Sequence, residues 1–287
     1  MVSNNLSKHR LGRSKSLAVN RVERCGDQKM TSLKNKVALV TGSARGIGKA
    51  IAVRYGSLGG SVVVNYSTDQ KGAQETVEEI ERGGSIAIAV QADISKVADI
   101  DRLFAAALDK FGRLDIVVAN AGVELVGQAA LDFTEADFDR LFGINTKGAF
   151  FTLQRAAKHV ADDGRIIYIG SSITAFPLPG RSLYGGSKVA PQFLIEVLAK
   201  EIGHKGVTVN SILPTAIEGA GVHTDGGSTD FRNFIKSFRP MQRMGTPNDV
   251  ANVAEYLAGD LAAFVSGQHL LVTWVHRPKV AQLMVEG

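Results

Sequence analysis

Short apolar runs alternate with longer amphipathic segments from Lys36 onward. The runs are apolar at consecutive positions, which is typical of strands covered on both faces by helices. The predicted strands are 37–40, 61–66, 86–91, 114–119, 165–170, 207–212 and 269–272. The predicted helices lie near 47–58, 70–82, 97–111, 135–160, 184–203 and 248–258. Strand alternating with helix predicts one doubly wound α/β domain with a parallel sheet of about seven strands.

We expect this domain to cover residues 33–273, followed by a tail at 274–287. Residues 1–32 carry no sustained apolar period, so we expect a basic extension that is disordered. Two other interpretations stay open for the leading segment. It is either a stretch upstream of a start at Met30 or a transit peptide, because it is basic and contains serine.

The net charge of +5 comes from the leading segment alone, since residues 1–30 hold seven basic and two acidic residues. The remaining 26 basic and 26 acidic residues cancel, which gives no electrostatic case for nucleic-acid binding. No apolar stretch of about 18 residues occurs, so we predict no membrane span. The single cysteine, Cys25, excludes an intrachain disulfide and favours a reducing compartment, the cytoplasm.

The first predicted strand runs directly into a glycine-rich loop, "VALVTGSARGIGKAIA", with Gly42, Gly46 and Gly48. A Rossmann dinucleotide site needs glycine for a tight turn, for close approach of a diphosphate and for packing of the next helix. That helix then offers its N-terminal N–H groups to the anion. A P-loop does not fit, because five residues separate Gly42 from Gly48 and Ala50 replaces the magnesium-binding hydroxyl. A glycine-rich turn without a ligand remains the alternative.

The end of the second strand favours NADP(H) over NAD(H). An NAD site usually has Asp or Glu there to bond the ribose hydroxyls, and this chain has Asn65, with no carboxylate before Asp69. Arg45, in the glycine loop, is suited to binding the 2′-phosphate of NADP. The alternative is that Arg45 is a solvated surface residue.

The segment "RSLYGGSK" (181–188) places Tyr184 one helical turn ahead of Lys188, on the same helix face. The ammonium and an oxidised nicotinamide would stabilise the phenolate, so we expect a pKa for Tyr184 lowered from about 10 toward neutrality. Such a phenol can donate a proton to an alkoxide or remove one in reverse. The spacing also occurs by chance. However, Ser171 stands thirteen residues earlier, at the carboxyl end of a strand, where ligands of doubly wound sheets bind.

These motifs resemble those of the classical short-chain dehydrogenase/reductase family, from about Val37 to about Val272. The glycine spacing T-G-x-x-x-G-x-G, "ANAG" at 119–122, Ser171 and the Tyr-Lys pair carry the resemblance. Its nearest branches are the 3-oxoacyl-carrier-protein-reductase-like and the polyol or naphthol ketoreductases. The resemblance implies hydride transfer between a nicotinamide and a small-molecule ketone or secondary alcohol.

The resemblance also implies roles for single residues. Ser171 would hold the substrate carbonyl, Tyr184 would transfer the proton, and Lys188 would bond the nicotinamide ribose. Asn145 would hold a water that links the lysine to solvent. Ser172 is given a structural role. The implied cofactor-binding set is Gly42, Ser43, Arg45, Gly46, Ile47, Gly48, Asn65, Tyr66, Asp93, Ile94, Asn120, Ala121, Gly122, Tyr184, Lys188, Pro214 and Ile217.

The chain departs from the family pattern in three places. Ala119 replaces the first Asn of N-N-A-G. After the sixth strand, Thr215 replaces the usual glycine and Gly219 the usual threonine, which leaves Pro214 and the backbone of Ile217 to hold the nicotinamide. The third departure is the tail, which continues "TWVHRPKVAQLMVEG" where the family commonly has a small-residue turn.

Residues 218–246 are predicted to form a substrate lid. Phe231, Phe234 and Phe238 share one helical face there. These side chains either dock the helix on the core or cover a hydrophobic carbonyl substrate.

We therefore predict an NADP(H)-dependent ketoreductase. An NAD-dependent alcohol or sugar dehydrogenase and a non-catalytic dinucleotide-sensing regulator are the alternatives. In relatives the two longest helices pair across a twofold axis, which implies a homodimer or homotetramer. His204 and His223 have no partner at metal-ligand spacing, so we expect no metal.

Overall fold

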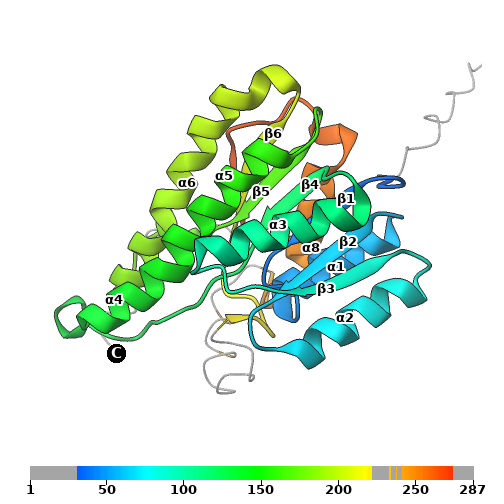
Figure 1. Cartoon of the computed structure of the whole chain (residues 1–287). Helices are drawn as coiled ribbons and strands as arrows, with labels where there is room; N and C mark the ends of the chain where they lie inside the picture. Colours follow the sequence, from blue (N-terminus) through cyan, green and yellow to red (C-terminus); the bar gives the residue numbers. More distant parts are fainter. Residues whose placement is uncertain (1–30, 222–232, 234–236, 238–240, 274–287) are drawn as a thin grey trace, which may run out of the picture. The chain divides into compact units, whose positions relative to one another are not determined.

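The computed structural model describes residues 31–221, 233, 237 and 241–273. Seven parallel strands form one sheet in the order β3-β2-β1-β4-β5-β6-β7 (Figure 1). The strands are β1 Val37–Val40, β2 Ser61–Tyr66, β3 Ala87–Gln91, β4 Ile116–Ala119, β5 Arg165–Ile169, β6 Thr208–Pro214 and β7 His269–Val272. The chain moves outward from β1 to β3 and then returns to the other side of β1. The loops after β1 and β4 therefore separate at the topological switch point, where doubly wound sheets bind ligands.

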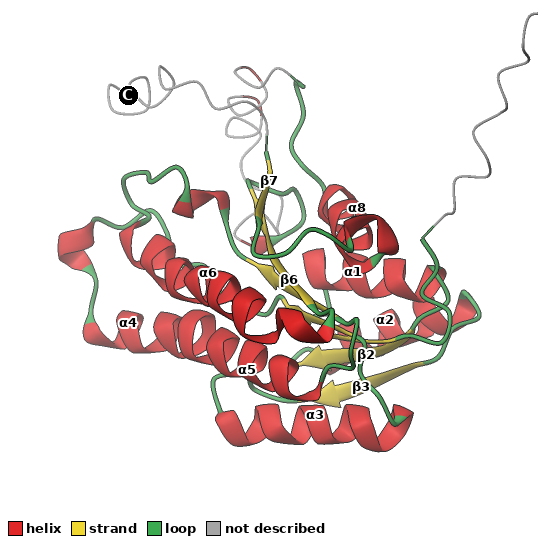
Figure 2. Ribbon diagram, turned by 90° about the horizontal axis from the view of Figure 1, so that it is seen from above, coloured by secondary structure: helices red, strands yellow, loops and turns green. Residues whose placement is uncertain are grey.

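Helices cover both faces of the sheet (Figure 2). One layer holds α1 Gly46–Ser57, α2 Gln70–Arg82 and α8 Pro247–Ala258, and the other holds α3 Val97–Phe111, α5 Ala149–His159 and α6 Ser182–Ile202. The strands alternate between two apolar cores, with Ala38 and Val40 in the first and Val37 and Leu39 in the second. This alternation explains why the central strands are apolar at consecutive positions.

The predicted elements agree with the structure to within about two residues at most ends. The main difference is the predicted helix 135–160, which consists of α4 Glu135–Phe142, a π-helix η2 Gly143–Gly148, and α5. The remaining short helices are η1 Ala130–Asp132, η3 Ser172–Thr174, η4 Gly203–Lys205 and η6 Asp260–Ala262. No helix within the described ranges has the length and apolar character needed to cross a bilayer.

The two ends of the predicted lid meet beside the sheet. Ile217 forms an isolated β-bridge with Gly245, and the N–H of Glu218 donates to the carbonyl of Gly245 at 2.8 Å. The predicted lid phenylalanines, Phe231, Phe234 and Phe238, lie outside the described residues, as do His223, residues 1–30 and the tail 274–287.

Candidate active site

A cleft of about 990 Å³ opens at the carboxyl ends of the strands. It collects most of the residues that the sequence assigned to cofactor and substrate. Those that line it are Gly42, Arg45, Gly46, Ile47, Gly48, Asn65, Tyr66, Asp93, Ile94, Asn120, Ala121, Gly122, Ser171, Tyr184, Lys188, Pro214 and Ile217. Among the assigned residues, Ser43 and Asn145 fall outside this lining.

The glycine loop owes its shape to backbone that only glycine adopts readily. Gly42 and Gly46 have φ of +62° and +58°, in the left-handed region. A Cβ at Gly48 would lie 2.4 Å from the Gly42 carbonyl oxygen and 2.5 Å from Asn120 Nδ2. The loop therefore packs directly against the start of α1, whose first residues Gly46, Ile47 and Gly48 line the cleft. This backbone cradle fits a dinucleotide diphosphate.

Ser43 and Asn65 support this loop from below. The Ser43 hydroxyl donates to the Val40 carbonyl (2.7 Å), and the Asn65 N–H donates to Ser43 Oγ (3.1 Å). Asn65 Oδ1 accepts the Gly42 N–H at 3.0 Å, and its amide donates to backbone carbonyls on the β3 side, including that of Ala92 at 3.1 Å. The Ser43 side chain is fully buried beneath the loop, and the assignment of Ser43 as a cofactor contact stays a prediction. The Asn65 side chain is likewise used to hold the loop to β3.

The adenosine end of the cleft is lined by residues that follow β2. Ser67 and Thr68 line it together with Arg45, and both hydroxyl residues were missed from the sequence. Their position directly after a strand-ending Asn-Tyr was the available signal. Asp69 also reaches the cleft, but its carboxylate accepts the Gly72 N–H at 2.9 Å and so caps α2.

Asp93 and Asn120 hold the loops that follow their strands. Asp93 Oδ1 accepts from the N–H (3.0 Å) and the hydroxyl (2.8 Å) of Ser95. Asn120 Nδ2 donates to the carbonyls of Thr41 (2.8 Å) and Gly42 (3.1 Å). Asn120 thus joins β4 to the glycine loop.

Tyr184 and Lys188 lie on α6 and are 7% and 4% exposed. The Tyr184 hydroxyl is hydrogen-bonded with the side chains of Ser171 and Glu124. Lys188 Nζ donates to the Ile169 carbonyl at 3.2 Å and lies 6.0 Å from the centre of the Tyr184 ring. The sequence-predicted Ser-Tyr-Lys group is therefore assembled on one wall of the cleft.

Burial dominates the electrostatics of this group. Burial, followed by the charge of Glu124, raises the pKa of the Tyr184 phenol well above its ordinary value, and the Ser171 hydrogen bond and the charge of Arg181 oppose this rise. Burial lowers the pKa of Lys188 to about 8, and Glu124 partly opposes that shift. The lowering of the Tyr184 pKa expected beside an oxidised nicotinamide stays a prediction.

Asn145 lies in η2 and is fully buried. Its Oδ1 accepts the Val123 N–H at 2.8 Å, and its Nδ2 donates to the Val123 carbonyl (2.9 Å) and Ser187 Oγ (3.0 Å). A Cβ at Gly122 would lie 3.0 Å from Lys188 Nζ and 3.1 Å from Asn145 Oδ1. The Asn145 amide and the Lys188 ammonium therefore both border Gly122. The sequence expected one helix here, and the π-helical turn is what brings Asn145 to this place.

A second interaction joins η2 to α6. Pro191 lies inside α6 and has no N–H to donate to the carbonyl four residues earlier, that of Ser187. The Thr146 hydroxyl donates to this carbonyl instead, at 2.8 Å. The helix that carries Tyr184 and Lys188 is therefore held to η2 by side-chain hydrogen bonds.

The substrate end of the cleft contains residues that the sequence did not single out. Glu124 lines it near Ser171 and Tyr184, and Ser172, expected to be only structural, lines it too. Thr215 and Ala216 complete the wall between Pro214 and Ile217. Glu124 follows β4 in a loop, where no periodicity indicates which way a side chain points.

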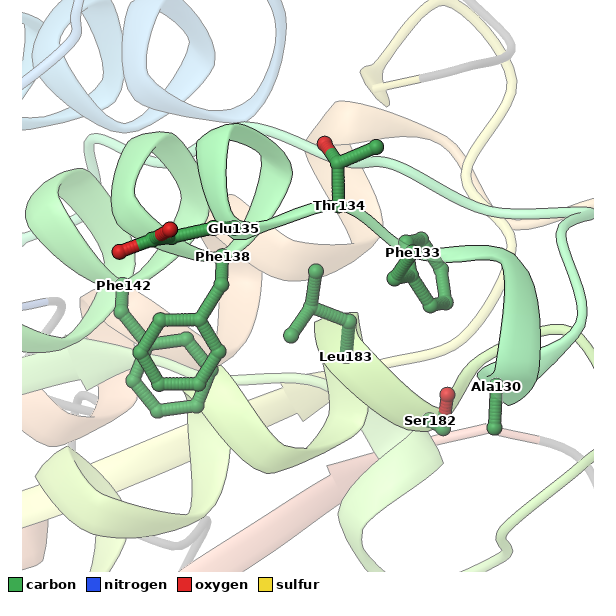
Figure 3. A pocket seen from close by; sticks show the side chains of 8 residues that line it. All are labelled: Ala130, Phe133, Thr134, Glu135, Phe138, Phe142, Ser182 and Leu183. Atoms are coloured by element: carbon green, nitrogen blue, oxygen red, sulfur yellow. The ribbon is translucent and has the colours of Figure 1, made fainter.

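A separate hollow of about 520 Å³ lies between α4 and the start of α6 (Figure 3). Phe138 and Phe142 stack there with ring centres 4.1 Å apart, near Leu183. Its lining residues are distinct from those of the cleft described above.

Comparison with known proteins agrees with this geometry. A sequence model described as enoyl-(acyl carrier protein) reductase matches residues 42–273. The hydroxynaphthalene reductase-like protein Arp2 of Metarhizium acridum is 41% identical over 254 residues, which cover 84% of this chain and 95% of the relative. A short chain dehydrogenase from Burkholderia cenocepacia, solved in complex with NADP, has a TM-score of 0.77 and 34% identity, over 84% of this chain and 97% of that one. The angucycline C-6 ketoreductase LanV, solved with bound NADP, has a TM-score of 0.78 and 33% identity, over 84% and 95%.

Proposed function

The chain belongs to the short-chain dehydrogenase/reductase family, and from that premise we propose that it is an NADP(H)-dependent ketoreductase. It would reduce the carbonyl group of a small-molecule ketone to a secondary alcohol. The observation that carries this proposal is the placement of Ser171, Tyr184 and Lys188 on one wall of the cleft that also contains the glycine loop.

The cofactor would supply the hydride, and the residues of the cleft fit it. The backbone of Gly42, Gly46 and α1 would bind the diphosphate. Arg45 would bind the 2′-phosphate at the adenosine end, where Ser67 and Thr68 offer hydroxyl groups. Two solved relatives, the Burkholderia dehydrogenase and LanV, contain NADP, which supports NADP(H) as the cofactor of this chain.

Each catalytic side chain has a separate task in the proposed reaction. Ser171 donates a hydrogen bond to the substrate carbonyl oxygen and so orients it. Tyr184 donates its proton to that oxygen as the alkoxide forms. Lys188 bonds the nicotinamide ribose and holds positive charge near the phenol. Asn145, near Lys188, keeps the η2 backbone in place beside it.

The state of the phenol favours reduction as the working direction. Because burial and Glu124 raise the pKa of Tyr184, the phenol is protonated at neutral pH and available as an acid. Alcohol oxidation needs the opposite state, a phenolate that accepts a proton. The buried phenol thus starts in the form that ketone reduction requires.

The test is to incubate the protein with NADPH and each of a panel of ketones, and to monitor oxidation of NADPH by the loss of its absorbance. A second measurement compares the Kd for NADPH with the Kd for NADH. We expect turnover of at least one cyclic ketone and tighter binding of NADPH. Tighter binding of NADH would instead indicate the NAD-dependent dehydrogenase. Cofactor binding without turnover of any ketone or alcohol would indicate the dinucleotide sensor.

We also propose that the chain assembles as a homodimer or homotetramer. Support comes from large apolar side chains that are exposed on α5 and α6, namely Phe150, Val189 and Phe193. Phe193 is 66% exposed, and exposed apolar groups of this kind favour association. Sedimentation velocity at micromolar concentration tests this, and a monomer alone would refute it.

A further inference from the structure

Glu124 places a carboxylate beside the reacting groups. It lies five residues beyond the end of β4, and it lines the same cleft as Ser171 and Tyr184. Its side chain is hydrogen-bonded with the Tyr184 hydroxyl. A carboxylate only accepts hydrogen bonds, so the phenol is the donor of this hydrogen bond and keeps its proton.

The carboxylate also lies against Gly221. A Cβ at Gly221 would lie 2.6 Å from Glu124 Oε2 and 3.2 Å from Oε1. Gly221 has φ of +58°, and it belongs to the first residues of the predicted lid. Glu124 is therefore close both to Tyr184 and to the backbone of a loop that lines the same cleft.

This position sets which part of a substrate meets Glu124. In the proposed reaction the carbonyl oxygen accepts from the Tyr184 hydroxyl, at about 2.6–3.2 Å. The one proton of that hydroxyl then no longer serves Glu124, so a bound ketone takes over this hydrogen bond, and groups on the carbon atoms next to the reacting carbonyl come within reach of the carboxylate. The Glu124 carboxylate also acts on the Lys188 ammonium, and the Arg181 guanidinium acts on the Tyr184 phenol, so several charged groups meet in this small region.

A hydrogen-bond acceptor such as the Glu124 carboxylate would discriminate between two substrate classes that the family resemblance leaves open, hydroxyketones and β-oxoacyl thioesters. A hydroxyl group near the reacting carbonyl can donate to Glu124. The thioester carbonyl of a β-oxoacyl substrate is itself an acceptor, and it would meet the carboxylate without a proton between them. Two acceptors brought together in a partly buried site repel each other and lose hydration, which makes this discrimination effective.

We propose that Glu124 is a substrate-recognition residue that accepts a hydrogen bond from a hydroxyl group close to the reacting carbonyl, so that the site selects hydroxyketones over β-oxoacyl thioesters. This inference rests on the proposed ketoreductase function and specifies its substrate class. The name of the Metarhizium relative, hydroxynaphthalene reductase-like, agrees with that class.

The experiment measures kcat/KM with NADPH for three probes: cyclohexanone, its α-hydroxy derivative and the N-acetylcysteamine thioester of acetoacetate. The readout is the ratio between probes within one protein. Removing Glu124 also alters Tyr184, but that effect is common to all probes and cancels in the ratio. Hydrogen bonds to a charged group contribute about 1.5–3 kcal/mol, so we expect the wild type to prefer the hydroxyketone to cyclohexanone by at least about tenfold.

Two variants complete the test. In Glu124→Ala the preference for the hydroxyketone should fall to within about twofold of unity. In Glu124→Gln the amide can also donate, so the thioester should gain at least about fivefold relative to cyclohexanone. Kd for NADPH and the unfolding temperature of each variant check that the site is intact.

The outcomes separate this inference from the function on which it rests. A wild type that reduces cyclohexanone and its hydroxy derivative equally well would overturn the role of Glu124 and leave the ketoreductase standing, even if both variants failed to fold. Ratios that do not change between the wild type and the variants would overturn it as well. A wild type that reduces no ketone at all would refute both proposals.

Discussion

The Gly48→Ala substitution tests the packing of the glycine loop most directly. The added methyl carbon would lie 2.4 Å from the Gly42 carbonyl oxygen and 2.5 Å from Asn120 Nδ2. Both separations are far shorter than a normal contact, and the oxygen belongs to the backbone and cannot rotate away. The loop must therefore move relative to α1. Overpacking of this kind costs about 1–3 kcal/mol.

Because the displaced backbone is the proposed diphosphate cradle, we expect much of this cost to fall on cofactor binding. A cost of about 1–3 kcal/mol corresponds to a Kd for NADPH raised about 5- to 140-fold. Isothermal titration with NADPH measures the change, and thermal unfolding of the cofactor-free variant measures the part that falls on the fold.

Gly203→Ala is the matched control. Gly203 has helical backbone (φ −59°, ψ −26°), and among the described residues a Cβ there meets no atom within 4 Å. We expect its Kd for NADPH to equal that of the wild type, and its unfolding temperature to equal or exceed the wild-type value. If Gly48→Ala bound NADPH within twofold of this control and unfolded at the same temperature, the inferred close packing of the loop against α1 would be refuted.

Three further substitutions test the site. Tyr184→Phe should lower kcat about 10²–10⁴-fold while the Kd for NADPH stays within about threefold of the wild-type value. The control, Tyr168→Phe, removes another buried phenol and should keep most of the turnover. Equal losses of kcat in the two variants would contradict the acid role of Tyr184. Arg45→Ala should raise the Kd for NADPH at least about tenfold and leave the Kd for NADH almost unchanged. The control is Lys49→Ala, which removes a nearby ammonium that pairs with Glu79 at 3.1 Å. An equal loss of affinity for both cofactors in Arg45→Ala would exclude a 2′-phosphate contact. Burial lowers the pKa of Lys188 to about 8 from 10.5, so the unfolded chain binds more protons between these values and the free energy of unfolding of the cofactor-free protein should rise with pH across that interval. Lys188→Met should abolish this rise in urea titrations at several pH values, and identical pH profiles for the two proteins would show that the lysine is not buried as described.

The fold could be predicted because its signals are local. The apolar runs and amphipathic segments place strands and helices without knowledge of their partners. Gly185, Gly186 and Pro191 are residue types that disfavour a helix. The structure nevertheless continues α6 from Ser182 to Ile202. Packing of its buried face on the sheet outweighs these weak formers, and Thr146 satisfies the carbonyl that Pro191 leaves without a donor.

The parts of the site that could not be predicted depend on side-chain direction and burial. Ser43 lies in the glycine loop and Asn65 at the end of β2, two places that the sequence associates with cofactor binding. Their side chains are directed into the protein and hold the glycine loop by hydrogen bonds. Glu124 lies in an irregular loop, so its approach to Tyr184 is known only from the folded chain. The pKa of Tyr184 moves upward for the same reason, since spacing indicates a nearby cation and does not indicate how dry the pocket is.

The π-helical turn contains one residue more than an α-helix that turns the chain equally far. Each residue of an α-helix turns the following segment by about 100°, and each residue of the wider π-helix turns it by roughly 80°. Deleting one residue within Gly143–Gly148 would therefore allow an ordinary helix to form, and the buried stripe Ala149, Thr152, Leu153 and Ala156 of α5 would keep its direction. The deletion would remove the wide turn that presents Asn145 to Val123 and Ser187. The extra residue thus serves the position of Asn145 and is not needed for the packing of α5.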